Sequence, residues 1–326
     1  MNVVPVGKTL YRPFALLVVL LVFCSPIYAY EGVITNERSG DILKFDGSGE
    51  VLDVKKICRR PRGMTQENKS TTLFIACSDD DKIILLEPKS LSTIGEIQNI
   101  PGAMSLRFHE PSNRLFVTNE GFARTTVIDL STQKTLAILE TGLEPDGVEI
   151  TDAGDRIFIA SENAGLVHVF DGNSYERIGD IVTNLRPRRL ALLNDQLWVS
   201  TEMGSRVEIF QTTTLSKISE IVFAPKGFRS EQMTPVDIKF SRDKSRAFVA
   251  LGAANHVAIV NTESLDIEKY ILVGRRAWGL AVTNDDQHLI VLNGLSDDFT
   301  IIDLASLRPQ ITQRAGLRPH AVEILK

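Results

Sequence analysis

The sequence predicts an all-β fold, a seven-bladed β-propeller, because two patterns recur along it with a common period. The first pattern is a pair of short apolar runs, of which residues 116–119 and 126–129 are one copy. Seven copies occur, and in all steps but one the residues that end the first run lie about 42 positions apart. These residues are Asn36, Ser78, Asn119, Ser161, Thr201, Leu251 and Asn293.

The second pattern marks the start of a further strand in each unit. It has the same period and falls at Pro61, Pro101, Pro145, Pro187, Pro235, Ala277 and Pro319. Each unit then holds four short strands separated by turn residues. Helices should be few, because no long stretch after residue 29 repeats its apolar residues with a period of 3.6. Four-stranded antiparallel blades repeated in this way define a β-propeller.

The two ends of the repeat region predict how the ring closes. The first unit begins at Val33 with no proline-type strand before it, whereas residues 319–325 supply an extra one. Pairing of this C-terminal strand into the first blade would remove an open sheet edge. We therefore expect the last strand of the chain to complete the first blade.

Residues 1–29 are typical of a secretory signal peptide. Lys8 and Arg12 precede the apolar run 14–23, and Ala29 is the small residue expected before a cleavage site. The run is shorter than the roughly 20 residues that span a bilayer. We expect cleavage after Ala29, one domain at residues 30–326 with no membrane span, and a periplasmic or secreted location. The alternative is an uncleaved N-terminal anchor.

Composition and cysteine count exclude several classes of protein. The 36 Lys and Arg residues are outnumbered by 41 Asp and Glu, so we expect no binding to nucleic acid. Three cysteines are too few for a disulfide framework or a four-cysteine metal site. Cys24 leaves with the signal peptide. Cys58 and Cys77 remain, either as a disulfide, which an oxidising compartment permits, or as two buried thiols.

These repeats resemble the YVTN-repeat β-propellers. Residues 116–129 nearly reproduce the motif of that family, and the resemblance spans residues 31–326. A narrower resemblance, to exported propellers associated with pyrroloquinoline quinone (PQQ)-dependent alcohol catabolism, is carried by residues 186–188, 197–200, 249–257 and 270–278. It implies an accessory role, with a quinoprotein dehydrogenase or another periplasmic protein as partner. It supplies no catalytic residues.

The strand order predicts where a site would lie. Loops before the proline-type strands and loops after the second strands share one face, which we call the top face. Because the proline-type strand is innermost, its first residues should surround the central channel. The candidates are Arg62, Asp146, Arg188, Trp278 and His320.

Several guanidinium groups that converge on a channel would attract carboxylates or phosphates. A small polyanion such as PQQ, or the acidic loop of a partner protein, would fit, and Trp278 would offer an aromatic face. The alternative is structural: the arginines would neutralise the acidic residues of neighbouring loops and hold blade to blade.

One repeat is longer than the others, with a step of about 50 residues. The surplus, residues 224–234, falls between the fifth and sixth units and should emerge on the top face. We expect it to form a partner-binding loop with Phe228, Arg229 and Met233, in which Phe228 and Met233 are exposed apolar contacts. The alternative is a flap that covers the domain.

Motifs of catalysis or metal binding are not found. The histidines lack ligand spacing, no Gly-x-Ser-x-Gly occurs, and the acidic residues 79–81 lack the spacing of an EF-hand. We therefore expect a non-catalytic exported protein that supports PQQ-dependent alcohol oxidation, with no metal and with PQQ as a candidate ligand. Two alternatives remain: an interaction scaffold unrelated to quinones, and a hydrolase similar to lactonase propellers.

Overall fold

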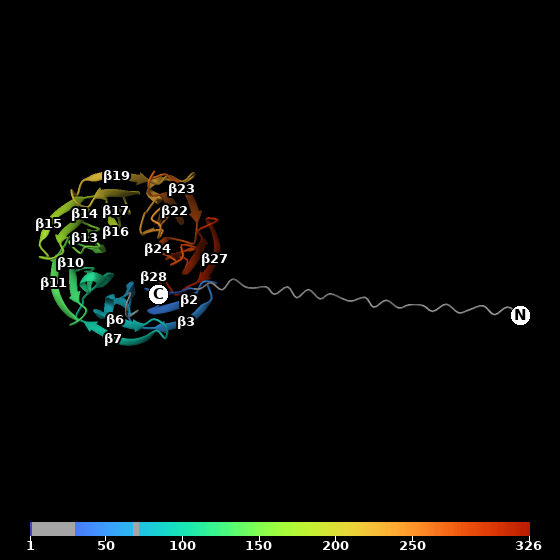
Figure 1. Ribbon diagram of the computed structural model, residues 1–326, viewed down its shortest axis with the longest axis horizontal. Helices are drawn as coiled ribbons and strands as arrows, with labels where there is room; N and C mark the ends of the chain where they lie inside the picture. The colour runs from blue at the N-terminus through green and yellow to red at the C-terminus, as the bar shows by residue number, and fades with distance from the viewer. Residues whose placement is uncertain (2–29, 68–71) are drawn as a thin grey trace.

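The computed structural model describes residue 1, residues 30–67 and residues 72–326, and Figure 1 shows it as a ring of blades. Within these residues, strands β1 to β28 form seven four-stranded antiparallel sheets. The sheets are arranged as a β-propeller, which confirms the predicted fold class. The expected signal peptide and Cys24 lie outside the described residues.

Each blade has its first strand nearest the central channel. These inner strands are β28 (Pro319–Ile324), β4 (Pro61–Gln66), β8 (Ala103–His109), β12 (Pro145–Ile150), β16 (Pro187–Leu193), β20 (Ile238–Phe240) and β24 (Ala277–Val282), in blades 1 to 7. Two predicted starts were displaced. In blade 3, Ala103 rather than Pro101 pairs with Asn119, and in blade 6 regular pairing begins only at Ile238, three residues after Pro235.

The two middle strands of every blade are the apolar runs that the sequence repeats, and both are buried. The second strands are β1 (Glu31–Asn36), β5 (Leu73–Cys77), β9 (Arg114–Asn119), β13 (Arg156–Ser161), β17 (Gln196–Thr201), β21 (Arg246–Ala250) and β25 (His288–Asn293). The third strands are β2 (Asp41–Asp46), β6 (Lys82–Glu87), β10 (Arg124–Asp129), β14 (Leu166–Asp171), β18 (Arg206–Gln211), β22 (His256–Asn261) and β26 (Asp298–Asp303).

The fourth strands form the rim of the ring and are largely exposed (Figure 1). They are β3 (Val51–Lys56), β7 (Ser92–Gln98), β11 (Lys134–Glu140), β15 (Arg177–Val182), β19 (Lys217–Val222), β23 (Ile267–Leu272) and β27 (Arg308–Arg314). In the described residues the helical segments are three short 3₁₀ turns, at Ser78–Asp80, Glu110–Ser112 and Ser230–Gln232. No helix there is long and apolar enough to cross a membrane.

The ring closes as predicted from the two ends of the repeat region. Strand β28, from the C-terminus, pairs antiparallel with β1, and blade 1 has the order β28-β1-β2-β3. The hydrophobic core lies between neighbouring blades rather than within one. Phe45 of blade 1 and Phe299 of blade 7 have ring centroids 4.7 Å apart, and Trp198 of blade 5 meets Phe240 of blade 6 edge to face at 5.2 Å.

Glycine allows the inner strands of adjacent blades to approach closely. A Cβ atom at Gly63 would lie 2.3 Å from the carbonyl oxygen of Met104, and one at Gly147 would lie 2.5 Å from that of Arg188. Because backbone atoms cannot move aside, a side chain at either position would push the blades apart. This close packing brings the inner-strand side chains together at the channel.

Candidate functional site

The five candidate residues of the channel occupy one structural position. Each is the second residue of the proline-type strand, in blades 1, 2, 4, 5 and 7, and we call the set the channel ring. After the first pair of each of these strands the register shifts, so a bulge carries the ring residue. The members are His320, Arg62, Asp146, Arg188 and Trp278.

The ring residues are connected by direct contacts. Arg188 Nη2 lies 3.0 Å from Asp146 Oδ2, and the Arg188 guanidinium carbon lies 4.8 Å from the centroid of the Trp278 ring. The Trp278 and His320 ring centroids are 6.2 Å apart. Arg62 is ion-paired with Glu120 and lines the same pocket as Arg188, Trp278 and His320.

A pocket of about 440 Å³ opens from this ring onto the top face. Six arginines and four glutamates line it together with Trp278 and His320. The charged residues are Arg60, Arg62, Arg186, Arg188, Arg276, Arg318, Glu37, Glu120, Glu144 and Glu162. The volume falls within the range of about 300–1,000 Å³ that is usual for small-molecule sites.

Left-handed backbone places five of these charged side chains at the pocket. The residue before the inner strand has a φ between 54° and 64° in blades 1, 2, 4, 5 and 7, although none of the five is glycine. Its carbonyl oxygen accepts a hydrogen bond from the residue that follows the second strand. These residues are Arg318, Arg60, Glu144, Arg186 and Arg276.

Most of the arginines are paired with acidic residues of neighbouring loops. Glu162 accepts from Arg186 Nε at 2.8 Å and lies 2.9 Å from Arg188 Nη1. Glu37 accepts from Arg60 Nε at 2.9 Å. These ion pairs join loops of adjacent blades, which is the arrangement that the structural alternative expects.

The acidic residues form an incomplete ring. Glutamate follows the second strand in blades 1, 3, 4 and 5, at Glu37, Glu120, Glu162 and Glu202. Blades 2, 6 and 7 carry Ser78, Leu251 and Gly294 at this position, so the widest gap spans the adjacent blades 6 and 7.

Two arginines beside this gap are consequently poorly compensated. Arg276 has one carboxylate partner among the described residues, Glu202 of blade 5, at 3.1 Å. Arg318 is half exposed, with Glu37 4.0 Å away. Burial lowers the pKa of Arg276, and nearby Arg188 adds to this effect despite Glu202. The pocket is therefore electropositive around Gly294 and Trp278.

Titration of the buried acids differs with their neighbours. Asp146 is fully buried, which would raise its pKa, but Arg189 and Arg188 hold the pKa below its usual value. Ser105 Oγ also donates to Asp146 at 3.0 Å. Burial, followed by the charge of Asp146, raises the pKa of Glu162 to about 7.

His320 is a buried neutral imidazole. Burial lowers its pKa well below the usual value, and Arg62 lowers it further. Neither ring nitrogen has a hydrogen-bond partner among the described residues. A histidine-based hydrolase would require an acidic side chain within hydrogen-bond distance of His320, and none of the described residues provides one.

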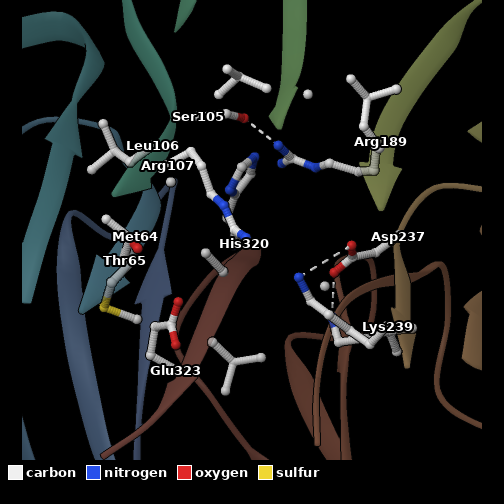
Figure 2. A pocket seen from close by; sticks show the side chains of 18 of the residues that line it. Met64, Thr65, Ser105, Leu106, Arg107, Arg189, Asp237, Lys239, His320 and Glu323 are labelled. Atoms are coloured by element: carbon white, nitrogen blue, oxygen red, sulfur yellow. Dashed lines mark hydrogen bonds and ion pairs between the residues drawn. The ribbon is translucent and has the colours of Figure 1, made fainter. Parts of the chain in front are cut away.

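A second cavity of about 120 Å³ lies below the ring, towards the opposite face (Figure 2). Figure 2 shows Arg189 bonded to Ser105 and Asp237 near Lys239, with Glu323 across the cavity. Sequence reasoning missed these residues. The repeat alignment contained the signal, because charged residues recur three positions after the channel-ring position of a blade. They are Glu323 and Glu149 after His320 and Asp146, and Arg107 and Lys239 after Met104 and Val236, which hold the equivalent position in blades 3 and 6. Burial raises the pKa of both Glu149 and Glu323.

The long segment between blades 5 and 6 does not expose the apolar residues that we expected. Met233 is 1% exposed and packs in the core with Phe223, so its expected role as an exposed contact is wrong. Phe228 is half-buried with its ring 5.1 Å from that of His256. Arg229 alone of the three is exposed. Met233 and Phe228 attach the segment to the propeller, because they pack in the same hydrophobic cluster as Ile238 of the short strand β20.

The cysteine pair lies beside the pocket. Cys58 and Cys77 form a disulfide with their Cα atoms 5.9 Å apart, so the two-thiol alternative does not hold in this structure. The bond attaches the loop that carries Arg59 and Arg60 to the end of β5. In the described part of the chain, no group of three or more His, Cys, Asp or Glu side chains could hold a metal ion.

No protein-family model matches the chain, and no curated protein matches it in sequence. Solved structures match in fold. The periplasmic gluconolactonase PpgL of Pseudomonas aeruginosa has a TM-score of 0.75 at 16% identity, with 91% of this chain and 99% of that chain covered. A functionally unknown protein from Desulfotomaculum acetoxidans has a TM-score of 0.77 at 12% identity, covering 90% and 98%.

A further match is the dihydro-haem d1 dehydrogenase NirN, solved in complex with DHE. Its TM-score is 0.68 at 11% identity, with 91% of this chain and 75% of that chain covered. At such identities the likeness defines the class of fold, a seven-bladed propeller, and the chemistry has to be argued from this chain's own site.

Proposed function

We propose that this protein is an exported β-propeller that binds a small carboxylate-bearing ligand in the top-face pocket, and that it does so without catalysis. The observation that carries the proposal is the gap in the acidic ring across blades 6 and 7, where Leu251 and Gly294 replace the glutamate. There Arg276 and Arg318 are poorly compensated, and both guanidinium and indole groups face the pocket. Arginine pairs bind carboxylates through charge-assisted hydrogen bonds, which makes this sector the receptor for the anionic group.

PQQ is our candidate ligand, and assistance to a quinoprotein dehydrogenase in alcohol oxidation is the role that we propose for the complex. PQQ is a planar tricarboxylate, so its charge matches the arginine sector and its ring suits Trp278. Support comes from the pocket volume of about 440 Å³ and from the family resemblance of the repeats. A periplasmic or secreted location belongs to the same proposal.

Ligand-induced stabilisation tests the proposal. Melting curves of the purified protein would be recorded with PQQ, with citrate as a non-aromatic tricarboxylate, and with calcium chloride. A ligand at 100 times its dissociation constant adds about 2.7 kcal/mol to the free energy of unfolding. We expect stabilisation by PQQ, less by citrate and none by calcium. No stabilisation by either carboxylate would overturn the proposal.

Gly294→Glu is the matched variant. It supplies the carboxylate that blades 1, 3, 4 and 5 carry, and a Cβ atom there meets only ordinary contacts, the nearest 3.8 Å away. We expect PQQ affinity to fall at least about tenfold, which is 1.4 kcal/mol. Gly95→Glu, on outer strand β7 with its Cβ contact at 3.6 Å, makes the same change far from the pocket and should leave affinity unchanged.

Hydrolysis of a sugar lactone is a second candidate function, favoured by one observation. The Glu162 carboxyl has a pKa of about 7, which suits a general base at neutral pH. Lactone opening yields a carboxylate, which the same arginines would bind. Acid release from gluconolactone, followed at constant pH, would reveal it. Activity that Glu162→Gln abolishes would replace the binding proposal; a rate equal to that without protein would exclude hydrolysis of this lactone.

A further inference from the structure

The top-face pocket and the lower cavity meet at a constriction. Among the residues that line them, Trp278 and His320 are the two that they share. Both are members of the channel ring, and both carry buried polar atoms that have no hydrogen-bond partner in the described part of the chain: the indole Nε1 of Trp278 and both ring nitrogens of His320. The His320 side chain, 3% exposed, reaches into the cavity in Figure 2.

Two arginines add further donors at the same level. The Nε atoms of Arg62 and Arg188 are buried and have no hydrogen-bond partner among the described residues, although Arg62 Nε lies 3.8 Å from Glu37 Oε1 and the outer nitrogens of both side chains are ion-paired. An indole N–H and an arginine Nε–H can only donate, and a neutral imidazole supplies one donor and one acceptor. The constriction thus holds four unused donors. The unbonded acceptor of the ring, Asp146 Oδ2, lies 3.0 Å from Arg188.

An unused buried donor is costly, because it has lost its hydrogen bonds to water and gained none in the protein. Native proteins rarely keep several such groups at one place unless a ligand, ion or ordered water accepts from them. The four donors come from blades 1, 2, 5 and 7, so they surround the channel rather than follow one strand. Their arrangement indicates an acceptor on or near the channel axis.

Charge determines which acceptor is favoured. The largest charge contributions at His320 come from four arginines, Arg62, Arg189, Arg188 and Arg60, and each lowers its pKa in the same direction as burial does. These positive charges favour an anion over a neutral water molecule at His320.

We propose that the constriction binds one small monovalent anion, of halide or carboxylate-group size, accepted by Trp278 Nε1, His320 and the Nε atoms of Arg62 and Arg188. This site is distinct from the arginine sector at Gly294 and does not depend on the proposed function. A halide would occupy it alone. A carboxylate would arrive either as a free ion such as formate or as one group of a larger ligand that fills the pocket above.

Bromide provides the direct test. Crystals grown in sodium bromide would be measured at the bromine absorption edge, where an anomalous peak between Trp278 and His320 is expected. In solution, the melting temperature should rise saturably with bromide or chloride, compared with sodium sulfate at equal ionic strength. Formate and acetate form the second arm: a rise with them as well shows that the site accepts carboxylates, whereas a rise with halides alone restricts it to halides.

Trp278→Phe removes one donor and keeps an aromatic ring. We expect halide affinity to fall about tenfold in this variant, or 1.4 kcal/mol. Trp198→Phe is the matched control, because its indole is also buried but donates to Gln196 at 3.1 Å between blades 5 and 6, away from the channel. The Trp198→Phe variant should differ from the wild type in melting temperature, but the rise in its melting temperature with halide should be the same as in the wild type. No peak at the constriction, or an equal response in Trp278→Phe, would overturn the site.

Discussion

Asp146 and Arg188 stand at the same position in two adjacent inner strands, and their side chains meet across the blade boundary with 3.0 Å between Oδ2 and Nη2. Neither is accessible to bulk solvent. The pair therefore joins blades 4 and 5 at the channel while its second member also forms part of the pocket. Binding residues and blade contacts are the same side chains here, so the predictions below concern the stability of the ring.

Removal of Asp146 should strongly destabilise the protein. Asp146→Ala leaves the buried Arg188 and the partly buried Arg189 without their shared carboxylate, and broken buried pairs cost about 3–5 kcal/mol. Urea unfolding at pH 7 would measure the loss. Asp79→Ala is the control, because that half-exposed carboxylate lies 3.7 Å from Arg60 and such pairs contribute about 0–1 kcal/mol. Equal effects of the two variants would contradict this assignment.

Glu162 should make stability depend on pH in a defined window. The folded protein holds its proton up to about pH 7, whereas the unfolded chain loses it near pH 4.5. Between these values the folded state binds more protons, so the free energy of unfolding falls as pH rises, by at most about 1.4 kcal/mol per pH unit. Glu162→Gln abolishes this contribution. The difference between wild type and variant should change across this window; parallel curves would refute the shift.

The disulfide should contribute substantially to stability. Cys58 and Cys77 are 19 residues apart, and closing a loop of similar length is worth about 3 kcal/mol in the chain-entropy account. The double variant Cys58→Ser, Cys77→Ser should unfold at a lower denaturant concentration than the oxidised protein. The same shift is expected when the wild type is reduced. If reduction does not change the midpoint, the bond does not constrain the unfolded chain as described.

Alanine substitutions should show which side chains attach the segment between blades 5 and 6 to the core. Met233→Ala removes a core side chain and should cost about 2–5 kcal/mol, as large-to-small core substitutions do. Arg229→Ala alters an exposed residue of the same segment and should leave the melting temperature nearly unchanged. A similar small effect of both would show that the segment packs more loosely than the structure indicates.

The repeat period alone predicted most of the architecture. Residues at equal places in each unit must lie at equal places in the ring, so strand order, closure by β28 and the common level of Arg62, Asp146 and His320 followed without any contact being known. The displaced start of β8 had a different cause. A proline two residues before the strand, Pro101, imitates the marker that other units carry at their first strand residue.

The side-chain partners within the site depended on depth, which the period does not encode. Met233 was expected on the surface because it lies in a long connecting segment. Instead, it packs in the hydrophobic core beside the short strand β20. Gly294 shows the opposite case. A glycine after a second strand carries no chemistry of its own, and its meaning emerges only from the glutamates that replace it in other blades.

Closure by β28 also has a consequence for the order of assembly. Thr35 and Ala321 face each other in blade 1 although 286 residues separate them, whereas the other six blades each form from one continuous stretch. The amide of Leu325 donates to the carbonyl of Glu31 at 2.8 Å, so the two ends of the ring lie side by side. A circular permutant that joins them and opens a loop between two other blades would convert this distant pairing into a local hairpin. It should therefore fold faster than the natural order, because low contact order speeds folding.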